Sequence, residues 1–226
     1  MTRDEFDRSR IAVLISGFGS NLQALLDIQA RGDWPGRVCV VISDKPEAHG
    51  LERARGAGVP AVSIPPAAYP DRDAFDQVLG DTLEQHDASL IVLAGFMRIL
   101  GPDFVDRFRG RMINVHPSLL PRFRGLRTHD RVLEAGDHHH GATVHFVTAE
   151  LDGGPRVIQY RLAVQAGDTP LSLSARVQAG EHIILPRAAG WFAAGRLIMT
   201  NQHPQLDGRP LLKPILMEAE DDTPTR

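Results

Sequence analysis

The sequence has little cysteine and no long apolar run, and both absences narrow what the chain can be. It contains one cysteine, Cys39, so no internal disulfide framework can form and a reducing compartment is expected. Cys39 lies inside the apolar run 38–42, which favours a buried thiol over a nucleophile. No stretch approaches the ~20 apolar residues of a membrane span, and the charged start has no apolar signal region. We therefore expect a cytoplasmic protein without a membrane partner.

The chain also lacks a strong excess of either charge. It carries 25 Lys and Arg against 28 Asp and Glu among its 226 residues, which gives no bias toward nucleic acid. There is no internal repeat and no linker-like stretch. We therefore expect a single domain over 11–215, preceded by a disordered start, 1–10, and followed by an acidic disordered tail, 216–226.

The first half of the chain alternates short apolar runs with helical patterns. Ile11 to Ile15 is continuously apolar and rich in β-branched residues, as in a parallel strand buried on both faces. Similar runs, separated by segments with helical spacing of apolar residues, lie at 38–42, 61–64, 90–94 and 112–113. This alternation predicts an α/β fold with a doubly wound, mostly parallel sheet.

The second half changes character. Ala142, Val144 and Phe146 alternate with Thr143 and His145, and a similar alternation recurs over 158–165. Strict alternation predicts strands with one wetter face, which we expect to be antiparallel additions to the sheet.

A long helix is expected after these strands. Thr169-Pro170 marks its start, because proline is favoured at the first helical position. Pro186 should kink or break it, since proline lacks the N–H that a helix interior needs. Residues 195–199 follow as a last short strand.

The segment Ser16-Gly17-Phe18-Gly19-Ser20-Asn21 connects the first strand to a helix, a layout that presents backbone N–H groups to an anion. It is not the dinucleotide fingerprint, whose third glycine would fall at Leu22, and it has no Walker lysine. Two interpretations stay open: a small anion site, or a tight turn with Ser20 and Asn21 as helix caps.

Polar side chains appear where the strand after Arg111 ends. Asn114 and His116 follow Met112-Ile113, and Pro117 then prevents a central strand from continuing. Two residues apart in an extended segment, the amide and the imidazole point to the same side. They suit proton transfer and charge stabilisation at a carbonyl, although a lone histidine is more often structural.

Two other clusters have competing interpretations. His138, His139, His140 and His145 suggest a metal, but their spacing fits no zinc pattern and a solvated loop is favoured. A basic stretch could be a solvated face or could bind an anionic ligand, and it comprises the arginines at 107, 109, 111, 122, 124 and 127.

Asn114-Val115-His116-Pro117-Ser118-Leu119-Leu120-Pro121 resembles the N-[IV]-H-P-S-L-L-P signature of the folate-dependent formyltransferases. Further segments that resemble family motifs follow the family order, at 19–21, 97–100, 144–148, 151–155 and 178–182. The resemblance runs from about Ile11 to Met199. Several motifs in order are more specific than any one of them.

The resemblance implies substrates and site residues. The donor would be 10-formyltetrahydrofolate and the acceptor glycinamide ribonucleotide, as in purine biosynthesis, with no metal, in a monomer or homodimer. The implied contacts to the ribonucleotide are Gly19, Ser20, Asn21 and Glu181. The implied contacts to the folate are Arg72, Met97, Arg98, Ile99, Leu100, Asn114 and Thr148.

The resemblance also implies catalytic roles for Asn114, His116 and Asp152. On its own, the composition of the segment Leu151-Asp152-Gly153-Gly154-Pro155 indicates only a turn. In the family, this aspartate partners the histidine. An imidazolium and an amide N–H₂ would stabilise the oxyanion of a tetrahedral intermediate, and the carboxylate would favour the charged ring.

The sequence departs from the family pattern at Arg127, where the family usually has histidine. A guanidinium cannot shuttle protons, so we predict an anion contact there instead. Arg122 to Gly125 also resembles methionyl-tRNA formyltransferases, but 226 residues leave no room for their RNA-binding domain. A formylfolate hydrolase would need no phosphate loop, and a catalytically inactive binding protein would not need Asn114, His116 and Asp152.

Overall fold

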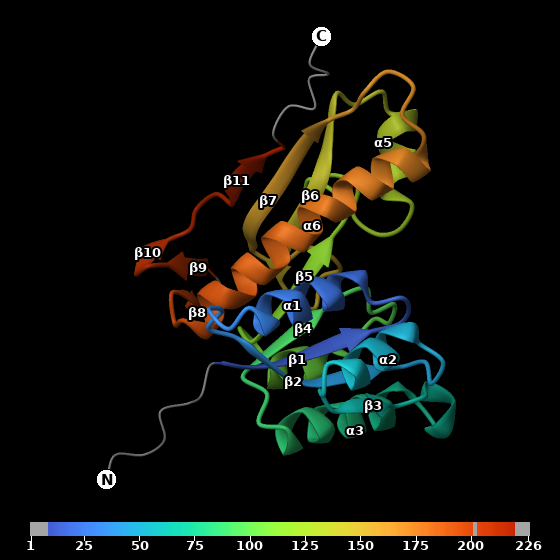
Figure 1. Ribbon diagram of the computed structural model, residues 1–226, viewed down its shortest axis with the longest axis vertical. Helices are drawn as coiled ribbons and strands as arrows, with labels where there is room; N and C mark the ends of the chain where they lie inside the picture. The colour runs from blue at the N-terminus through green and yellow to red at the C-terminus, as the bar shows by residue number, and fades with distance from the viewer. Residues whose placement is uncertain (1–8, 201–202, 220–226) are drawn as a thin grey trace.

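An eight-stranded sheet runs through the computed structural model, which describes residues 9–200 and 203–219 (Figure 1). Its strands are β1 (Arg10–Ile15), β2 (Arg37–Ser43), β3 (Ala61–Ser63), β4 (Leu90–Leu93), β5 (Met112–His116), β6 (His139–Phe146), β7 (Arg156–Ala163) and β11 (Ile215–Glu218). They lie in the order β11-β7-β6-β5-β4-β1-β2-β3. A separate three-stranded sheet comprises β8 (Leu197–Thr200), β9 (His203–Leu206) and β10 (Arg209–Pro210).

Helices cover both faces of the large sheet. One apolar core joins it to α1 (Ser20–Ala30), α2 (His49–Gly56), α5 (Thr128–Glu134) and α6 (Pro170–Ala193), and the other joins it to α3 (Arg72–Gln85) and α4 (Pro102–Arg107). Strand β1 contributes side chains to both cores, because Ile11 and Val13 face the first while Ala12 and Leu14 face the second. This explains why its sequence is apolar throughout.

The pairing directions confirm the predicted fold class. Strands β1 to β5 pair in parallel, whereas β6 is antiparallel to both β5 and β7. The register of β5 with β6 sets Asn114 opposite His145 and His116 opposite Thr143. Polar side chains from two strands therefore converge where β5 ends.

The strand order creates a crevice at one edge of the sheet. The chain moves from β1 outward to β2 and β3, then returns to β4 on the other side of β1. The loops after β1, β4 and β5 all leave this carboxyl edge, where ligands bind in doubly wound folds. Gly19 and the predicted folate segment, 97–100, lie on these loops, and Asn114 and His116 lie at the end of β5 itself.

Several local expectations are wrong. Arg10 belongs to β1 and residues 216–218 belong to β11, so neither segment is disordered there. Residues 1–8 and 220–226 lie outside the described residues. The predicted strand at 195–199 appears as β8, but it is not the last, because β9, β10 and β11 follow.

Helix α6 does not break at Pro186. It continues to Ala193, with Pro186 buried and its carbonyl accepting a hydrogen bond from the Trp34 indole N–H at 3.0 Å. Packing along the buried face of this 24-residue helix outweighs the local cost of the missing N–H. Among the described residues, no helix has the length and apolar character needed to cross a membrane.

Candidate active site

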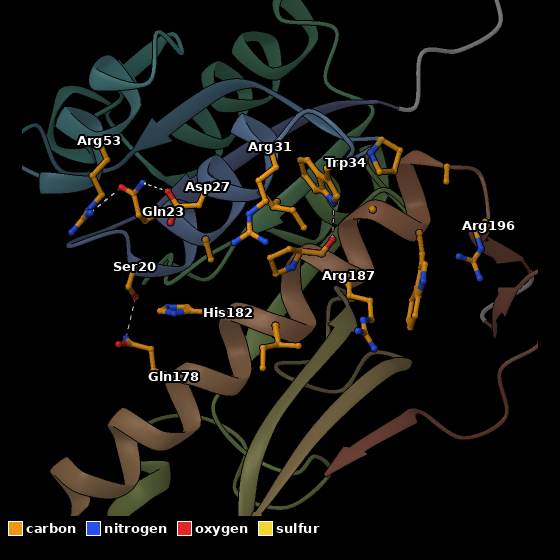
Figure 2. A pocket seen from close by; sticks show the side chains of 18 of the residues that line it. Ser20, Gln23, Asp27, Arg31, Trp34, Arg53, Gln178, His182, Arg187 and Arg196 are labelled. Carbon is orange, nitrogen blue, oxygen red and sulfur yellow. Dashed lines mark hydrogen bonds between the residues drawn. The ribbon is translucent and has the colours of Figure 1, made fainter. Parts of the chain in front are cut away.

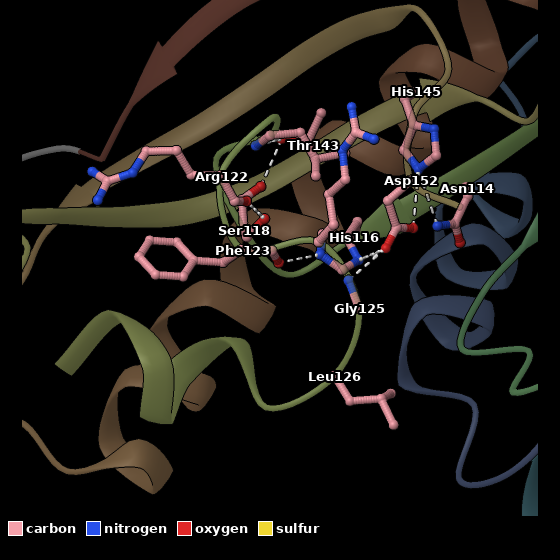
Figure 3. A network of polar contacts seen from close by, with 12 residues as sticks. Asn114, His116, Ser118, Arg122, Phe123, Gly125, Leu126, Thr143, His145 and Asp152 are labelled. Atoms are coloured by element: carbon pink, nitrogen blue, oxygen red, sulfur yellow. Dashed lines mark hydrogen bonds and ion pairs between the residues drawn. The ribbon is translucent and has the colours of Figure 1, made fainter. Parts of the chain in front are cut away.

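The three predicted catalytic side chains lie together where β5 ends (Figure 3). His116 Nδ1 is 3.4 Å from Asp152 Oδ2, and both side chains are more than nine-tenths buried. The N–H on His116 Nε2 donates to the Phe123 carbonyl at 3.0 Å. Both ring nitrogens therefore face oxygen acceptors, an arrangement that a doubly protonated ring satisfies.

Asp152 connects the cluster to the loop that follows β5. Its Oδ2 also accepts the Gly125 backbone N–H at 2.8 Å, and its own backbone is left-handed with φ 49°. Glycine or asparagine usually takes this conformation, so the turn is held by its surroundings. The carboxylate thus fixes His116 and the loop around Phe123 at the same time.

His145 is a site residue that the sequence interpretation missed. Its Nδ1–H donates to the Phe146 carbonyl at 2.9 Å, so its Nε2 is free to accept from the Asn114 amide at 3.2 Å. Burial lowers the pKa of His145 to about 4, so the ring is neutral. It holds the Asn114 amide in one orientation, with Asp152 Oδ1 3.8 Å away. The sequence signal for His145 was its place among the polar residues that alternate with Ala142, Val144 and Phe146, and the structure then sets it opposite Asn114.

The interpretation of the histidine cluster as a solvated loop holds for exposed His138, which precedes β6, but is wrong for the three histidines within that strand. His139 opens β6, and His140 and His145 are 1% and 2% exposed. His140 Nε2 lies 3.0 Å from His129 Nδ1, and burial lowers the pKa of His140 to about 4. Across the described residues, no group of three or more His, Cys, Asp or Glu is arranged to hold a metal.

The loop after β1 has the geometry of an anion site. Gly19 has φ 76° and stands at the N-cap of α1 without a side-chain cap, so the first N–H groups of the helix stay available. This favours the anion-site interpretation, because neither Ser20 nor Asn21 acts as the N-cap. Ser20 Oγ instead accepts from Gln178 on α6 at 3.0 Å, and Gln178 is a second residue that our site prediction omitted.

Asn21 and Glu181 are brought together although 160 residues separate them. The Asn21 amide donates to Glu181 Oε2 at 2.7 Å inside the protein. Burial raises the pKa of the Glu181 carboxyl, and the Asn21 amide opposes that shift. The amide oxygen of Asn21, Oδ1, is buried and accepts no hydrogen bond from the described residues.

A groove of about 910 Å³ opens beside this loop, between α1 and α6 (Figure 2). Ser20 and Gln178 line one end of it, and Trp34 and Arg187 lie farther along.

The predicted folate segment lies on the loop after β4. Met97 and Ile99 are 64% and 68% exposed, whereas Leu100 is buried, so its side chain cannot meet a ligand without movement. The Met97 N–H donates to Ser16 Oγ at 2.8 Å, which links this segment to the end of β1. The Arg98 guanidinium lies 5.0 Å from the Phe75 ring centre on α3.

The remaining folate candidates lie at the rim. Arg72 starts α3, and its Nε lies 3.8 Å from Asp73 Oδ1. Thr148 Oγ1 donates to the Glu150 carbonyl at 3.3 Å in the loop before Asp152. Their contacts neither support nor oppose a role in folate binding, which stays a prediction.

The basic stretch is largely neutralised within the protein. Arg107 bridges Asp81 and Glu84, and the arginines at 109, 122 and 124 each pair with a carboxylate. Arg127, at the N-cap of α5 with φ 56°, is exposed and faces Asp130 and Glu134 at 3.8 and 3.7 Å. These pairs favour a solvated face over a ligand site.

Known proteins share this arrangement of chain and loops. The formyl transferase family model matches residues 9–189. The phosphoribosylglycinamide formyltransferase of Escherichia coli is 49% identical over 89% of this chain and 95% of its own. A human trifunctional purine biosynthetic protein is 43% identical over 84% of this chain, which corresponds to 19% of that protein. The solved phosphoribosylglycinamide formyltransferase of Coxiella burnetii superposes with TM-score 0.88 at 48% identity, over 92% of this chain and 98% of its own.

Proposed function

Because the chain belongs to the formyl transferase family, we propose that it transfers the formyl group of 10-formyltetrahydrofolate to the amino group of glycinamide ribonucleotide. Relatives named for this reaction align along nearly their whole length. The observation that carries the proposal is the pairing of His116 with Asp152 in the same crevice edge as an uncapped helix N-terminus. The pair of His116 and Asp152 suits acyl chemistry, and the N-terminus of α1 suits a phosphate.

The acceptor is proposed to bind through its phosphate at Gly19, Ser20 and Asn21. The backbone N–H groups of the first turn of α1 supply the donors. Glu181 holds Asn21 in place and offers its second oxygen to the ribose side of the ligand. The acceptor amine would then extend toward Asn114 and His116.

The donor is proposed to lie along the segment 97–100. Exposed Met97 and Ile99 offer apolar surface to the flat pterin ring, and backbone groups of the segment offer hydrogen bonds. Arg72 and Arg98 are the proposed partners of its carboxylates, Thr148 lies at the same rim, and Asn114 stands between donor and acceptor.

The chemistry is an addition followed by an elimination. The acceptor amine adds to the formyl carbon, and the carbonyl oxygen becomes an oxyanion. The Asn114 amide, oriented by His145, and the protonated His116 ring stabilise that charge. The carbon–nitrogen bond to the folate then breaks. The protonated His116 ring, held by Asp152, donates its proton to the departing nitrogen, and the neutral ring then takes up the proton that the former amine loses.

His116 must exchange a partner to do this. Its Nε2–H donates to the Phe123 carbonyl in the absence of substrate. We propose that bound substrate replaces the Phe123 carbonyl as the acceptor of this N–H. The hydrogen bond from the Gly125 N–H to Asp152 would keep the loop around Phe123 in place.

The direct test is tetrahydrofolate release from 10-formyltetrahydrofolate, with and without glycinamide ribonucleotide. Release that requires the ribonucleotide supports the transferase. Release at the same rate without it identifies a hydrolase, the alternative that makes the loop at Gly19 unnecessary. Cytoplasmic location and a monomeric or homodimeric state stay predictions.

A further inference from the structure

The side chains so far assigned to the proposed phosphate subsite carry no positive charge. Ser20, Asn21 and Gln178 are neutral, and the ionisable member of the group, Glu181, is an acid. A phosphate monoester carries about −1.5 to −2 charges near neutral pH. Helix N–H groups and the α1 dipole offset about half a charge. A basic side chain close to the loop would offset the remaining charge.

Arg53 on α2 is the basic side chain bonded to this loop (Figure 2). Its Nε donates to the Phe18 carbonyl at 2.9 Å, and its Nη1 donates to Gln23 Oε1 on α1 at 2.9 Å. Its guanidinium carbon is 4.3 Å from the centre of the Phe18 ring, which also stacks on His49. The guanidinium thus has the loop backbone, a loop ring and the first turns of α1 as neighbours.

Close backbone packing fixes where α2 presents Arg53. The Gly50 N–H donates to the Gly17 carbonyl at 3.1 Å. A Cβ added to Gly19 would lie 2.9 Å from the Gly50 Cα and 3.7 Å from the Arg53 Cδ. The loop and α2 therefore cannot separate or slide without breaking this contact. The Arg53 side chain is therefore held beside the Gly19 backbone, which is the N-cap of α1.

The other basic groups along the groove have different surroundings. Arg196 makes a two-pronged pair with Asp207, at 2.7 and 2.8 Å, and Arg187 contacts the Met217 sulfur at 3.2 Å. Figure 2 shows Arg31 beside Trp34, away from Ser20. Burial lowers the pKa of His182, which favours its neutral form. The described contacts thus single out Arg53 as the loop's cation.

We propose that Arg53 supplies the positive charge of the phosphate subsite and orients its loop from behind through the Phe18 carbonyl. This inference rests on the proposed function for the identity of the acceptor. Arg53 acts on binding rather than on the reacting atoms, so it is a positioning and charge-supplying residue. Its loss should change affinity for phosphorylated ligands and leave the donor unaffected.

Arg53→Gln tests this, with Arg55→Gln as the matched control because Arg55 is exposed on the same helix. We expect Arg53→Gln to weaken binding of glycinamide ribonucleotide, and of ribose 5-phosphate as a probe, by about 5- to 20-fold in calorimetry. Arg53→Lys, which keeps the charge, should recover most of that loss. Wild-type affinity should fall with added salt more steeply than that of Arg53→Gln.

Three outcomes are decisive. Unchanged ribose 5-phosphate affinity in Arg53→Gln would overturn the assignment. Equal weakening of 10-formyltetrahydrofolate, or no recovery in Arg53→Lys, would reduce Arg53 to a packing residue and overturn it as well. Arg53-dependent binding of ribose 5-phosphate without formyl transfer to the ribonucleotide would keep the Arg53 assignment and reject the proposed function instead.

Discussion

The proposed phosphate loop after β1 and the proposed catalytic cluster after β5 lie at the same edge of the sheet but are built differently. The loop is five consecutive residues, 17–21, and the groups that we propose to face the phosphate are the uncapped backbone N–H groups at the start of α1. The cluster joins Asn114 and His116 to His145 and Asp152 from two later segments of the chain. One region acts through backbone conformation, and the other through side chains that position each other.

This difference predicts how each region responds to substitution. A loop that binds through N–H groups loses affinity gradually, because each side chain only supports the backbone. A cluster of interdependent side chains loses rate steeply, because removing one member leaves the others misdirected. The predictions below run from the largest expected effect to the smallest.

The largest effect is expected from His116→Ala in the cluster. It removes both the proposed proton carrier and a partner of the oxyanion, so kcat should fall by ~10²–10⁴. Steady-state formyl transfer measures this. Turnover within a few-fold of wild type would remove His116 from the mechanism.

His145→Phe tests the residue that orients Asn114. The ring keeps its volume but loses the acceptor for the Asn114 amide, so kcat should fall by roughly 10- to 100-fold, less than for a lost oxyanion donor. Because the pKa of His145 is about 4, the shape of the kcat–pH profile above pH 6 should not change. A shifted profile would show that His145 itself titrates during catalysis.

Asn21→Ala tests the loop. It removes a side chain proposed to contact the ribonucleotide phosphate, and stranding such a charged partner costs ~1–3 kcal/mol, which corresponds to about 5- to 150-fold in affinity. KM for glycinamide ribonucleotide should rise by about that factor, with kcat and KM for the folate nearly unchanged. A comparable rise in the folate KM would make the loop a structural element only.

The two regions should also respond oppositely to acid. His140 and His145 have folded pKa values of about 4 against 6.5, so the unfolded chain binds more protons between these values and stability falls as pH falls. Glu181 has a raised folded pKa, so the native state binds more protons just above 4.5 and acid stabilises it. Urea midpoints should therefore decrease between pH 6.5 and 5, more steeply in Glu181→Gln and less steeply in His140→Asn. Identical slopes in both variants would contradict this difference.

The smallest effect is expected at Arg127. Its guanidinium is exposed and faces Asp130 and Glu134 on its own helix, and such pairs contribute ~0–1 kcal/mol. Arg127→Gln should change either KM by about twofold or less, and any change should shrink with added salt. A tenfold, salt-sensitive rise in one KM would restore the anion contact predicted from sequence.

The same two regions show how far the sequence alone can predict. The strand, turn and helix around Gly19 were located correctly because their signals are local: an apolar run, glycines, then helical spacing. Strands β1 to β5 were found for the same reason. His116 and Asp152 were paired only through family resemblance, since a turn and a strand end 36 residues apart carry no local sign of contact.

The sequence predictions failed where contacts between distant segments determine the structure. Alternation in β6 showed that its two faces differ in polarity but not that both are buried, and Thr143 and His145 turn inward toward the site. The prediction of a break at Pro186 followed from the local effect of proline on a helix, which the packing of α6 overrides. Strand β11 pairs with β7 across more than 50 residues, which no local pattern in 215–218 could reveal.

The comparison is tested most directly by calorimetric titration of glycinamide ribonucleotide into His116→Ala and Asn21→Ala, alongside their kcat values. The account predicts that His116→Ala binds the ribonucleotide within about twofold of wild type while its turnover collapses by ~10²–10⁴. Asn21→Ala should show the reverse, with weakened binding and near-normal turnover at saturation. If both variants lost affinity and turnover to similar degrees, the separation between a binding loop and a catalytic cluster would be contradicted.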